Sequence, residues 1–365
     1  MLLRSLIGLL WAFAILFGLN FLLSSEDSGF QAIHEAAQNG NAKAQHNLGF
    51  MYAEGLSVQQ DTERALKWYR RAANQGNVRS QYNLGIRYEN GRGVRQDYAQ
   101  ALKWYQRAAD QGYSMAQSNL GAMYDAGRGV RQDYAQALKW YRRAADQGYS
   151  TAQTNLGGMY DAGRGLRQDY EQALKWYQRA ADQGEVVAQY NLGVMYFVGK
   201  GVEQDYTKAQ NWSHFAAEQG YAKAQSNLGV MYAEGKGVPR DYERALKWYR
   251  LAAEQGEAIA QKNLGDMYVD GRGVSQSYAQ AVKFYRLAAE QGEANAQYNL
   301  GVIHANGEGV PQDITSAYVW FSISKENGND KAAQIMDRVA KLLSPQDLSQ
   351  AQHRADAFIE KQGSY

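Results

Sequence analysis

One tripeptide, Asn-Leu-Gly, recurs eight times along the chain at a constant interval of 36 residues. Its leucines are Leu48, Leu84, Leu120, Leu156, Leu192, Leu228, Leu264 and Leu300. A fixed period of this length is typical of repeat proteins, in which each unit buries its apolar face against its neighbours. The eight copies cover residues 41–328 without a linker-like stretch. We therefore expect one continuous solenoid rather than separate globular domains.

Each copy predicts two helices joined by a glycine-containing turn. In the third copy, Ala116, Leu120 and Met123 are spaced i, i+4 and i+7, which is the apolar face of a first helix. Gly127 can end this helix, because glycine takes the positive φ found just past a helix C-terminus. Asp133 is placed to N-cap a second helix. The second helix carries Tyr134, Ala137, Leu138, Trp140, Tyr141, Ala144 and Ala145, and ends at Gly148.

The residues of the copies carry a resemblance to known families. Leu-Gly-x-x-Tyr followed by Ala-x-x-x-Tyr resembles the core of tetratricopeptide repeats. The 36-residue length, the Gly-x-Gly-Val-x-Gln-Asp connection and the Trp-Tyr-x-x-Ala-Ala-x-Gln-Gly ending are similar to the Sel-one-like repeat family. The resemblance covers all eight copies. It implies an all-α, right-handed α/α solenoid that serves as a protein-binding scaffold, often exported in bacteria.

Positions that do not vary between copies are most simply explained by stacking, since every copy must stack. Gly121 lies in the middle of a predicted helix, where glycine costs about 1 kcal/mol relative to alanine, so we expect a close helix–helix approach there. Trp140 has a tryptophan equivalent in six other copies and Phe284 in the remaining one. We expect this ladder in the core, an aromatic sugar platform being the alternative. Asn119 and its equivalents are expected to satisfy a buried backbone group, or alternatively to bind an extended peptide.

Positions that vary between copies would determine binding specificity. If the first helices line the concave side, as the resemblance implies, five positions of each helix face the groove. The third and fourth copies place Asp125, Thr154 and Asp161 there, an acidic stretch. The fifth copy places five apolar residues there, which suits a docking site, unless helix rotation puts two or three of them in the core. The predicted partner-binding residues are Tyr82, Val187, Tyr190, Val194, Phe197, Val198 and Tyr298.

Composition and motifs give little support to catalysis, cofactors or metals. A net charge of +2 argues against nucleic-acid binding, and the absence of cysteine excludes thiolate chemistry. The five histidines form no i, i+4 pair, and no phosphate-binding or nucleophile-elbow motif is present. Ser322-x-x-Lys325 matches one serine-enzyme motif, but the partner motifs of that class are missing. The arginines of the glycine loops are expected to form a solvated ridge. They are Arg92, Arg95, Arg128, Arg131, Arg164 and Arg167.

The N-terminal segment predicts export. Residues 6–23 carry no charge and as a helix would span roughly 27 Å, close to the hydrocarbon thickness of a bilayer. Arg4 precedes the run and acidic residues follow it, which places the rest of the chain across the membrane. Residues 1–25 are therefore an uncleaved signal anchor or a cleaved signal peptide, with a buried core helix as the third interpretation. We expect a protein anchored in the inner membrane and facing the periplasm, or a soluble periplasmic or secreted protein after cleavage.

The two ends of the array predict caps. Residues 26–40 contain a lone helix that would seal the first copy, and residues 329–365 contain two more. An amphipathic helix is expected over 329–343, and Ser344-Pro345 opens a second helix with a polar outer face. The whole sequence predicts a monomeric, non-catalytic scaffold that binds a protein or peptide in its groove. The alternatives are a cell-wall enzyme of the penicillin-binding or β-lactamase type, or a module that binds glycan or peptidoglycan.

Overall fold

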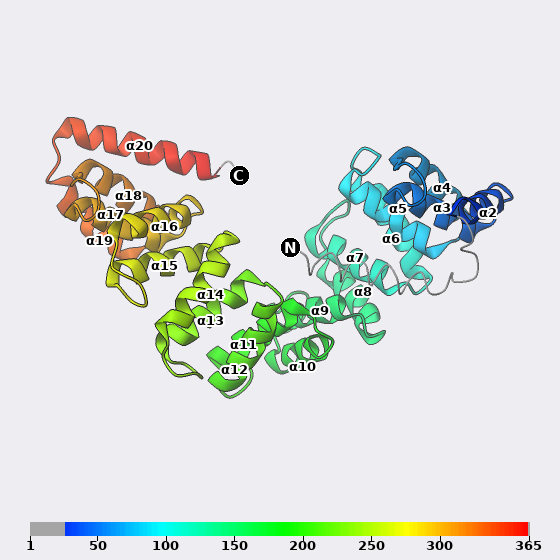
Figure 1. The fold of residues 1–365 in the computed structure, drawn as a ribbon, viewed down its shortest axis with the longest axis horizontal. Coiled ribbons are helices and arrows are strands. Elements are labelled where there is room, and N and C mark those ends of the chain that lie inside the picture. The colour runs from blue at the N-terminus through cyan, green and yellow to red at the C-terminus, as the bar shows by residue number, and fades with distance from the viewer. Residues whose placement is uncertain (1–25, 364–365) are drawn as a thin grey trace. The chain divides into compact units, whose positions relative to one another are not determined.

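A computed structural model describes residues 26–363 as 19 α-helices, and this part of the chain contains no strand (Figure 1). The predicted all-α repeat architecture is confirmed. The helices fall into two compact units, unit 1 ending at Trp176 and unit 2 beginning at Tyr177. The predicted N-terminal anchor or signal peptide, residues 1–25, lies outside the described residues. Within the described residues, no helix has the length and apolar character needed to cross a membrane.

The helices follow the 36-residue period in pairs. Unit 1 contains α2 (Glu26–Gln38), α3 (Ala42–Glu54), α4 (Thr62–Asn74), α5 (Val78–Asn90), α6 (Tyr98–Asp110), α7 (Ser114–Ala126), α8 (Tyr134–Asp146) and α9 (Ser150–Ala162). The boundary between the units falls within α10 (Tyr170–Ala181). Unit 2 continues with α11 (Val186–Val198), α12 (Tyr206–Glu218), α13 (Ala222–Glu234), α14 (Tyr242–Glu254), α15 (Ala258–Asp270), α16 (Tyr278–Glu290), α17 (Ala294–Asn306), α18 (Ile314–Glu326), α19 (Asp330–Ala340) and α20 (Pro345–Gly363).

We call the first helix of each copy its A helix and the second its B helix. The A helices are α3, α5, α7, α9, α11, α13, α15 and α17, and the B helices are α4, α6, α8, α10, α12, α14, α16 and α18. In the third copy, Gly127 ends α7 in the left-handed conformation with φ of 68°. The Asp133 carboxylate accepts a hydrogen bond from the Gln136 amide at the start of α8. Both predicted helix boundaries are thus confirmed.

The invariant glycine of each A helix marks a close helix–helix approach, as predicted. A Cβ placed on Gly121 would lie 2.8 Å from Cδ1 of Tyr141, because the ring of this B-helix tyrosine lies flat over the glycine. The fifth copy differs, since Gly193 faces the hydroxyl of Ser213 instead of a ring. Leu120 and Met123 are fully buried between copies. An A helix can therefore approach its B helix closely only where the glycine is present.

A buried ladder of glutamines joins successive copies, and sequence reasoning missed it. Gln117 donates from Nε2 to the backbone carbonyl of Ala109, at 3.1 Å, in the preceding B helix. Gln147 at the end of α8 in turn donates to Oε1 of Gln117, at 2.7 Å. The same two bonds recur in other copies of both units. Because an unpaired polar group in the core is costly, the glutamine fixes where the next copy starts.

Helices also pack against both ends of the array. α2 packs against α3 of the first copy, and α19 and α20 both pack against α18 of the eighth copy. The amphipathic helix expected over 329–343 is shorter, because Asn329 serves as its N-cap and α19 ends at Ala340. At the start of α20 the hydroxyl of Ser344 accepts from the Asp347 amide at 3.1 Å.

Candidate functional site

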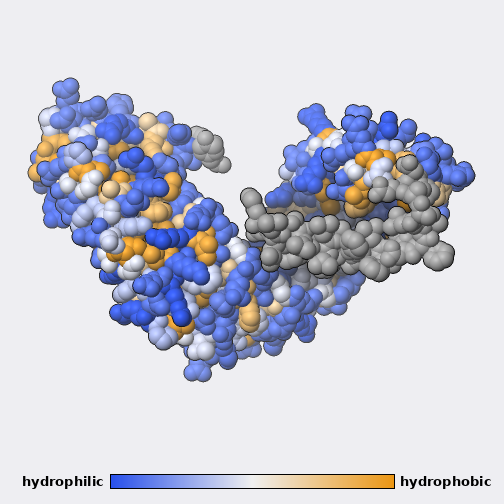
Figure 2. Space-filling model, viewed as in Figure 1, coloured by the Kyte–Doolittle hydropathy of each residue, from blue (hydrophilic) through white to orange (hydrophobic). Residues whose placement is uncertain are grey.

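The A helices form the surface on which the sequence predicts partner binding, and we call this surface the A face. Within unit 2, α11 contacts α13 and α13 contacts α15, so their side chains make one continuous surface. On the face drawn in Figure 2, apolar side chains form patches around α13, α14 and α15, separated by hydrophilic ones. Five of the seven predicted partner-binding residues belong to a single A helix of this unit, α11.

The apolar residues of α11 divide between an exposed edge and the core. Val198 is 56% exposed at the end of the helix, whereas Val187 and Val194 are half-buried. Tyr190 and Phe197 pack against the core cluster that contains Leu228 and Met231. The Phe197 ring lies against Tyr206, at 5.3 Å between centroids, and the ammonium group of Lys236 lies 5.1 Å above it. Of these five residues Val198 is thus the exposed one, and the other four are half-buried, with the two aromatic rings against the core.

The predicted tyrosines lie at the seam between copies. The Tyr190 ring contacts Tyr221 at the start of the next A helix, with centroids 5.2 Å apart. Tyr82 makes the same contact with Tyr113 in unit 1, also at 5.2 Å. Burial raises the pKa of Tyr82 to about 12. Tyr298 lies against Phe321 of its own copy. Tyr82, Tyr190 and Tyr298 belong to three different copies, the second, the fifth and the eighth.

Three of the invariant asparagines have a side-chain partner, where we expected a buried backbone group. Asn119 hydrogen-bonds with the hydroxyl of Tyr105 in the preceding B helix. Asn263 and Asn299 make the same bond to Tyr249 and Tyr285. The glutamine ladder serves the backbone carbonyls instead.

The acidic stretch of unit 1 is paired and does not form an open acidic groove. Both Asp125 carboxylate oxygens accept from Nη1 of Arg164, at 2.9 Å, in the glycine loop of the next copy. Arg128 pairs with Glu89 in the same way, at 3.5 Å. Thr154 is buried and its hydroxyl donates to the Ser150 carbonyl. Arg128 and Arg164 are 55% and 41% exposed, as a solvated ridge requires, but each also pairs with a carboxylate of the neighbouring copy.

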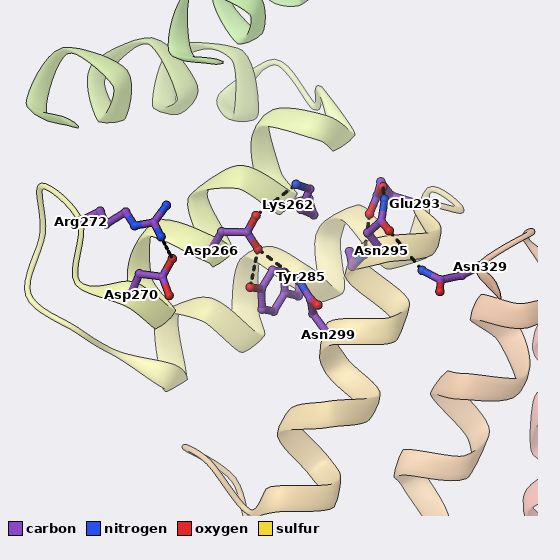
Figure 3. A network of polar contacts seen from close by, with 10 residues as sticks. Lys262, Asp266, Asp270, Arg272, Tyr285, Glu293, Asn295, Asn299 and Asn329 are labelled. Carbon is purple, nitrogen blue, oxygen red and sulfur yellow. Dashed lines mark hydrogen bonds and ion pairs between the residues drawn. The ribbon is translucent and has the colours of Figure 1, made fainter. Parts of the chain in front are cut away.

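A polar network lies on the A face of the seventh and eighth copies (Figure 3). Asp266 accepts from the Tyr285 hydroxyl at 2.7 Å and from Nδ2 of Asn299 at 3.2 Å. Lys262 pairs with its other carboxylate oxygen at 3.1 Å. Burial and the nearby Asp266 carboxylate both raise the pKa of Tyr285. One feature of the sequence could have pointed to this network. Asp266 is charged at a position, two residues after the repeat leucine, that is apolar or glycine in the other copies.

The tryptophans of the first four copies belong to the core, as predicted, whereas the rings at this position in the last four copies are half-buried. Trp140 is 4% exposed, and the Arg143 guanidinium lies 4.7 Å from its ring centroid, which leaves no open platform for a sugar. In the serine-enzyme motif, Ser322 is half-buried and Lys325 exposed, and the hydrogen bonds of the described residues do not join them. Ser324 is the buried serine of this turn, and its hydroxyl donates to the Ala294 carbonyl at 2.7 Å. Within residues 26–363, no three acidic or histidine side chains gather as metal ligands would.

Comparisons with known proteins agree with this architecture. The Sel1 repeat family matches eight consecutive segments of 36 residues that together cover residues 42–329. The solved structure of a Sel1 repeat protein from Oxalobacter formigenes is 36% identical over 86% of this chain and 91% of its own, with a TM-score of 0.64. The structure of c5321, a protective antigen of uropathogenic Escherichia coli strains with an SLR fold, is 32% identical over 91% of this chain and 94% of its own, with a TM-score of 0.57. A comparison with curated proteins found no match.

Proposed function

The chain belongs to the Sel1 repeat family, and from this premise we propose that it is a non-catalytic scaffold that binds a protein or peptide partner on its A face. The repeat array has the scaffold fold of that family, whose members generally bind proteins. The observation that carries the choice of face is the exposed apolar edge of α11. Val198 is 56% exposed there, beside Phe197 and Lys236.

The neighbouring helices extend this edge into a surface of mixed chemistry. Val230 on α13 occupies the position of Val194 on α11, and both are half-buried on contacting helices. The next A helix, α15, carries the Lys262–Asp266 pair together with Ile259, which is 52% exposed. A suitable partner segment therefore has apolar side chains where it lies on α11 and α13, and both polar and apolar groups where it reaches α15. Apolar anchors supply most of the affinity, and the ion pair would discriminate between segments.

We also propose that the chain is exported and acts as a monomer facing the periplasm. The uncharged stretch of residues 6–23 supports this placement. If it is uncleaved, it tethers the scaffold to the inner membrane, and if it is cleaved the scaffold is soluble. Cell fractionation, followed by N-terminal sequencing of the mature protein, tests the placement separately from partner binding.

The test of the A face uses the full chain with a C-terminal tag in its native cell. Crosslinking and mass spectrometry identify the partner, and the affinity of the purified pair is then measured. Val198→Asp places a charge on the exposed apolar edge, so we expect binding to weaken about tenfold or more. Leu342→Asp is the matched control, because Leu342 is equally apolar and 69% exposed but lies after α19. Equal affinity of the Val198→Asp variant and the wild type would reject this face.

A further inference from the structure

One position on the B helices changes character along the chain. It lies three residues after the ladder tryptophan. Its residues are Arg71, Arg107, Arg143, Arg179, Phe215, Leu251, Leu287 and Ile323. Four arginines are thus followed by four apolar residues. The change separates the fifth to eighth copies from the first four.

In unit 1 the arginine covers the tryptophan beneath it. Arg71, Arg107 and Arg143 each lie 4.7 Å above the ring of the tryptophan three residues earlier. In the fifth to seventh copies an apolar side chain takes that place, and the aromatic ring beneath is only half-buried. Phe215, Leu251 and Leu287 are 50%, 37% and 40% exposed. We call these three residues, all within unit 2, the outer stripe.

In the eighth copy, a helix of this chain covers the ladder tryptophan and the residue three positions after it. Ile323 is fully buried there, and the Phe358 ring of α20 lies 5.6 Å from that of Trp320. Gln362, near the end of α20, donates to the carbonyls of Ala289 and Glu290 at the end of α16. The amphipathic helix α20 therefore ends beside α16, which carries the next residue of the outer stripe, Leu287.

A shallow groove runs along the outer side of one B helix in each unit. In the seventh copy it follows α16 and includes Val282 and Leu287. In the first copy it follows α4 at the equivalent positions and includes Leu66 and Arg71. The two grooves lie at equivalent positions, and one difference between them is that Leu287 stands where the first copy has Arg71.

We propose that the outer stripe docks an amphipathic helix of a partner protein, which packs beside α20 across α16, α14 and α12. The surface continues one that α20 already covers, so a helix is the occupant that its shape accepts. The helices α12, α14 and α16 are joined through the A helices α13 and α15 that pack between them, so a helix that crosses them meets one stripe residue on each. Exposed Lys247 and Lys283 flank one side of the stripe, and Glu254 and Glu290 the other. The partner helix therefore carries acidic residues along one edge and basic residues along the other.

The probe is a labelled peptide of residues 344–363, which has the apolar face of α20, and its binding to the full chain is measured by fluorescence anisotropy. The test variant combines Phe215→Arg, Leu251→Arg and Leu287→Arg. It should fold, because the first four copies have arginine at these positions. We expect it to bind the peptide about tenfold more weakly or worse. A peptide with Phe358→Asp should also bind weakly, and the Val198→Asp chain should bind as the wild type does.

Three results would overturn the proposal. The first is peptide binding that is absent, or unchanged in the triple arginine variant. The second is binding of the wild type, but not of the variant, to neutral phosphatidylcholine vesicles, which assigns the stripe to a membrane. The third is a wild-type dimer that the variant converts to a monomer, which assigns the stripe to a second copy of the chain.

Discussion

The same core positions recur in both units, but the units differ on the surfaces formed by their A helices and their B helices. On the B helices, unit 1 covers its tryptophans with arginine, whereas unit 2 leaves apolar residues exposed. On the A helices, unit 1 pairs Asp125 with Arg164 of the next copy and exposes Phe50, whereas unit 2 exposes Val198 and Ile259. The leucine, glycine and glutamine that join the copies do not change. Stacking therefore fixes one set of positions in every copy and leaves the other positions free to form a binding surface.

The largest expected effect is the fall in the free energy of unfolding when one ladder tryptophan is removed from each unit in turn. Trp140→Ala removes a side chain that is 4% exposed, so we expect the free energy of unfolding to fall by about 3–5 kcal/mol. Trp248→Ala removes a half-buried ring from unit 2, so we expect a smaller loss of about 2 kcal/mol. Urea unfolding followed by circular dichroism measures both. A loss under about 1 kcal/mol for Trp140→Ala would show that the ladder is not part of the core.

His46 should make the stability of the first copy depend on pH, and we expect this effect to be of intermediate size. Burial and the nearby charge of Arg79 lower the pKa of His46 to about 4, below its ordinary value of 6.5. As the pH falls through this interval, the unfolded chain takes up a proton that the folded chain does not. Stability is therefore complete above about pH 6.5 and is lost towards pH 4, by at most about 1.4 kcal/mol per pH unit.

Urea unfolding at several pH values, compared between wild type and His46→Gln, measures this effect. The variant should lose part of the slope and keep the part that comes from His304 in unit 2, whose pKa is also lowered by burial. An NMR titration of the wild type gives the pKa of His46 directly. A pKa near the ordinary histidine value would contradict the buried, neutral state in which Nδ1 lies 2.9 Å from the Ser80 hydroxyl.

The smallest expected effect is the loss of an ion pair between copies of unit 1. Asp125→Asn removes the charge that Arg164 meets, and the arginine is 41% exposed, so we expect a loss of about 1 kcal/mol or less. The loss should shrink in 1 M salt, which screens exposed charges. Thermal unfolding at low and high salt measures it. Lys208→Gln in unit 2, which removes an exposed pair with Asp205 in the same helix turn, is the control that should change stability even less.

The sequence predicted the contacts that every copy must make. Gly121 was expected at a close approach and lies under the Tyr141 ring. Trp140 was expected in the core and is buried there. Such positions can be predicted because eight internal copies face the same stacking problem, so a residue that stacking requires appears in all of them. The partner of a residue is harder to predict, and Asn119 was assigned a backbone group although it bonds to a tyrosine hydroxyl.

The candidate site depended on contacts between copies that no pattern within one copy contains. Val187, Tyr190, Val194, Phe197 and Val198 were expected on one wall, and in the structure Val198 is exposed while the other four are half-buried. Whether a side chain of an A helix is exposed to solvent depends on which residues of the next copy pack against it. Lys236 covers Phe197 from the loop after α13, 39 residues along the chain. A 36-residue period gives the place of that loop but not which of its side chains turns inward.

The sequence alone determined the helical hairpin, its period, its core and its family, because apolar spacing and helix caps act within a few turns of the chain. Only the tertiary structure decided which charges are paired and which apolar residues remain open to a partner. Arg164 was expected in solvent and also pairs with Asp125, and Ile323 and Leu287 share a repeat position although only Ile323 is covered by α20. Exposure depends on the neighbours that stacking and the final helix bring to a side chain.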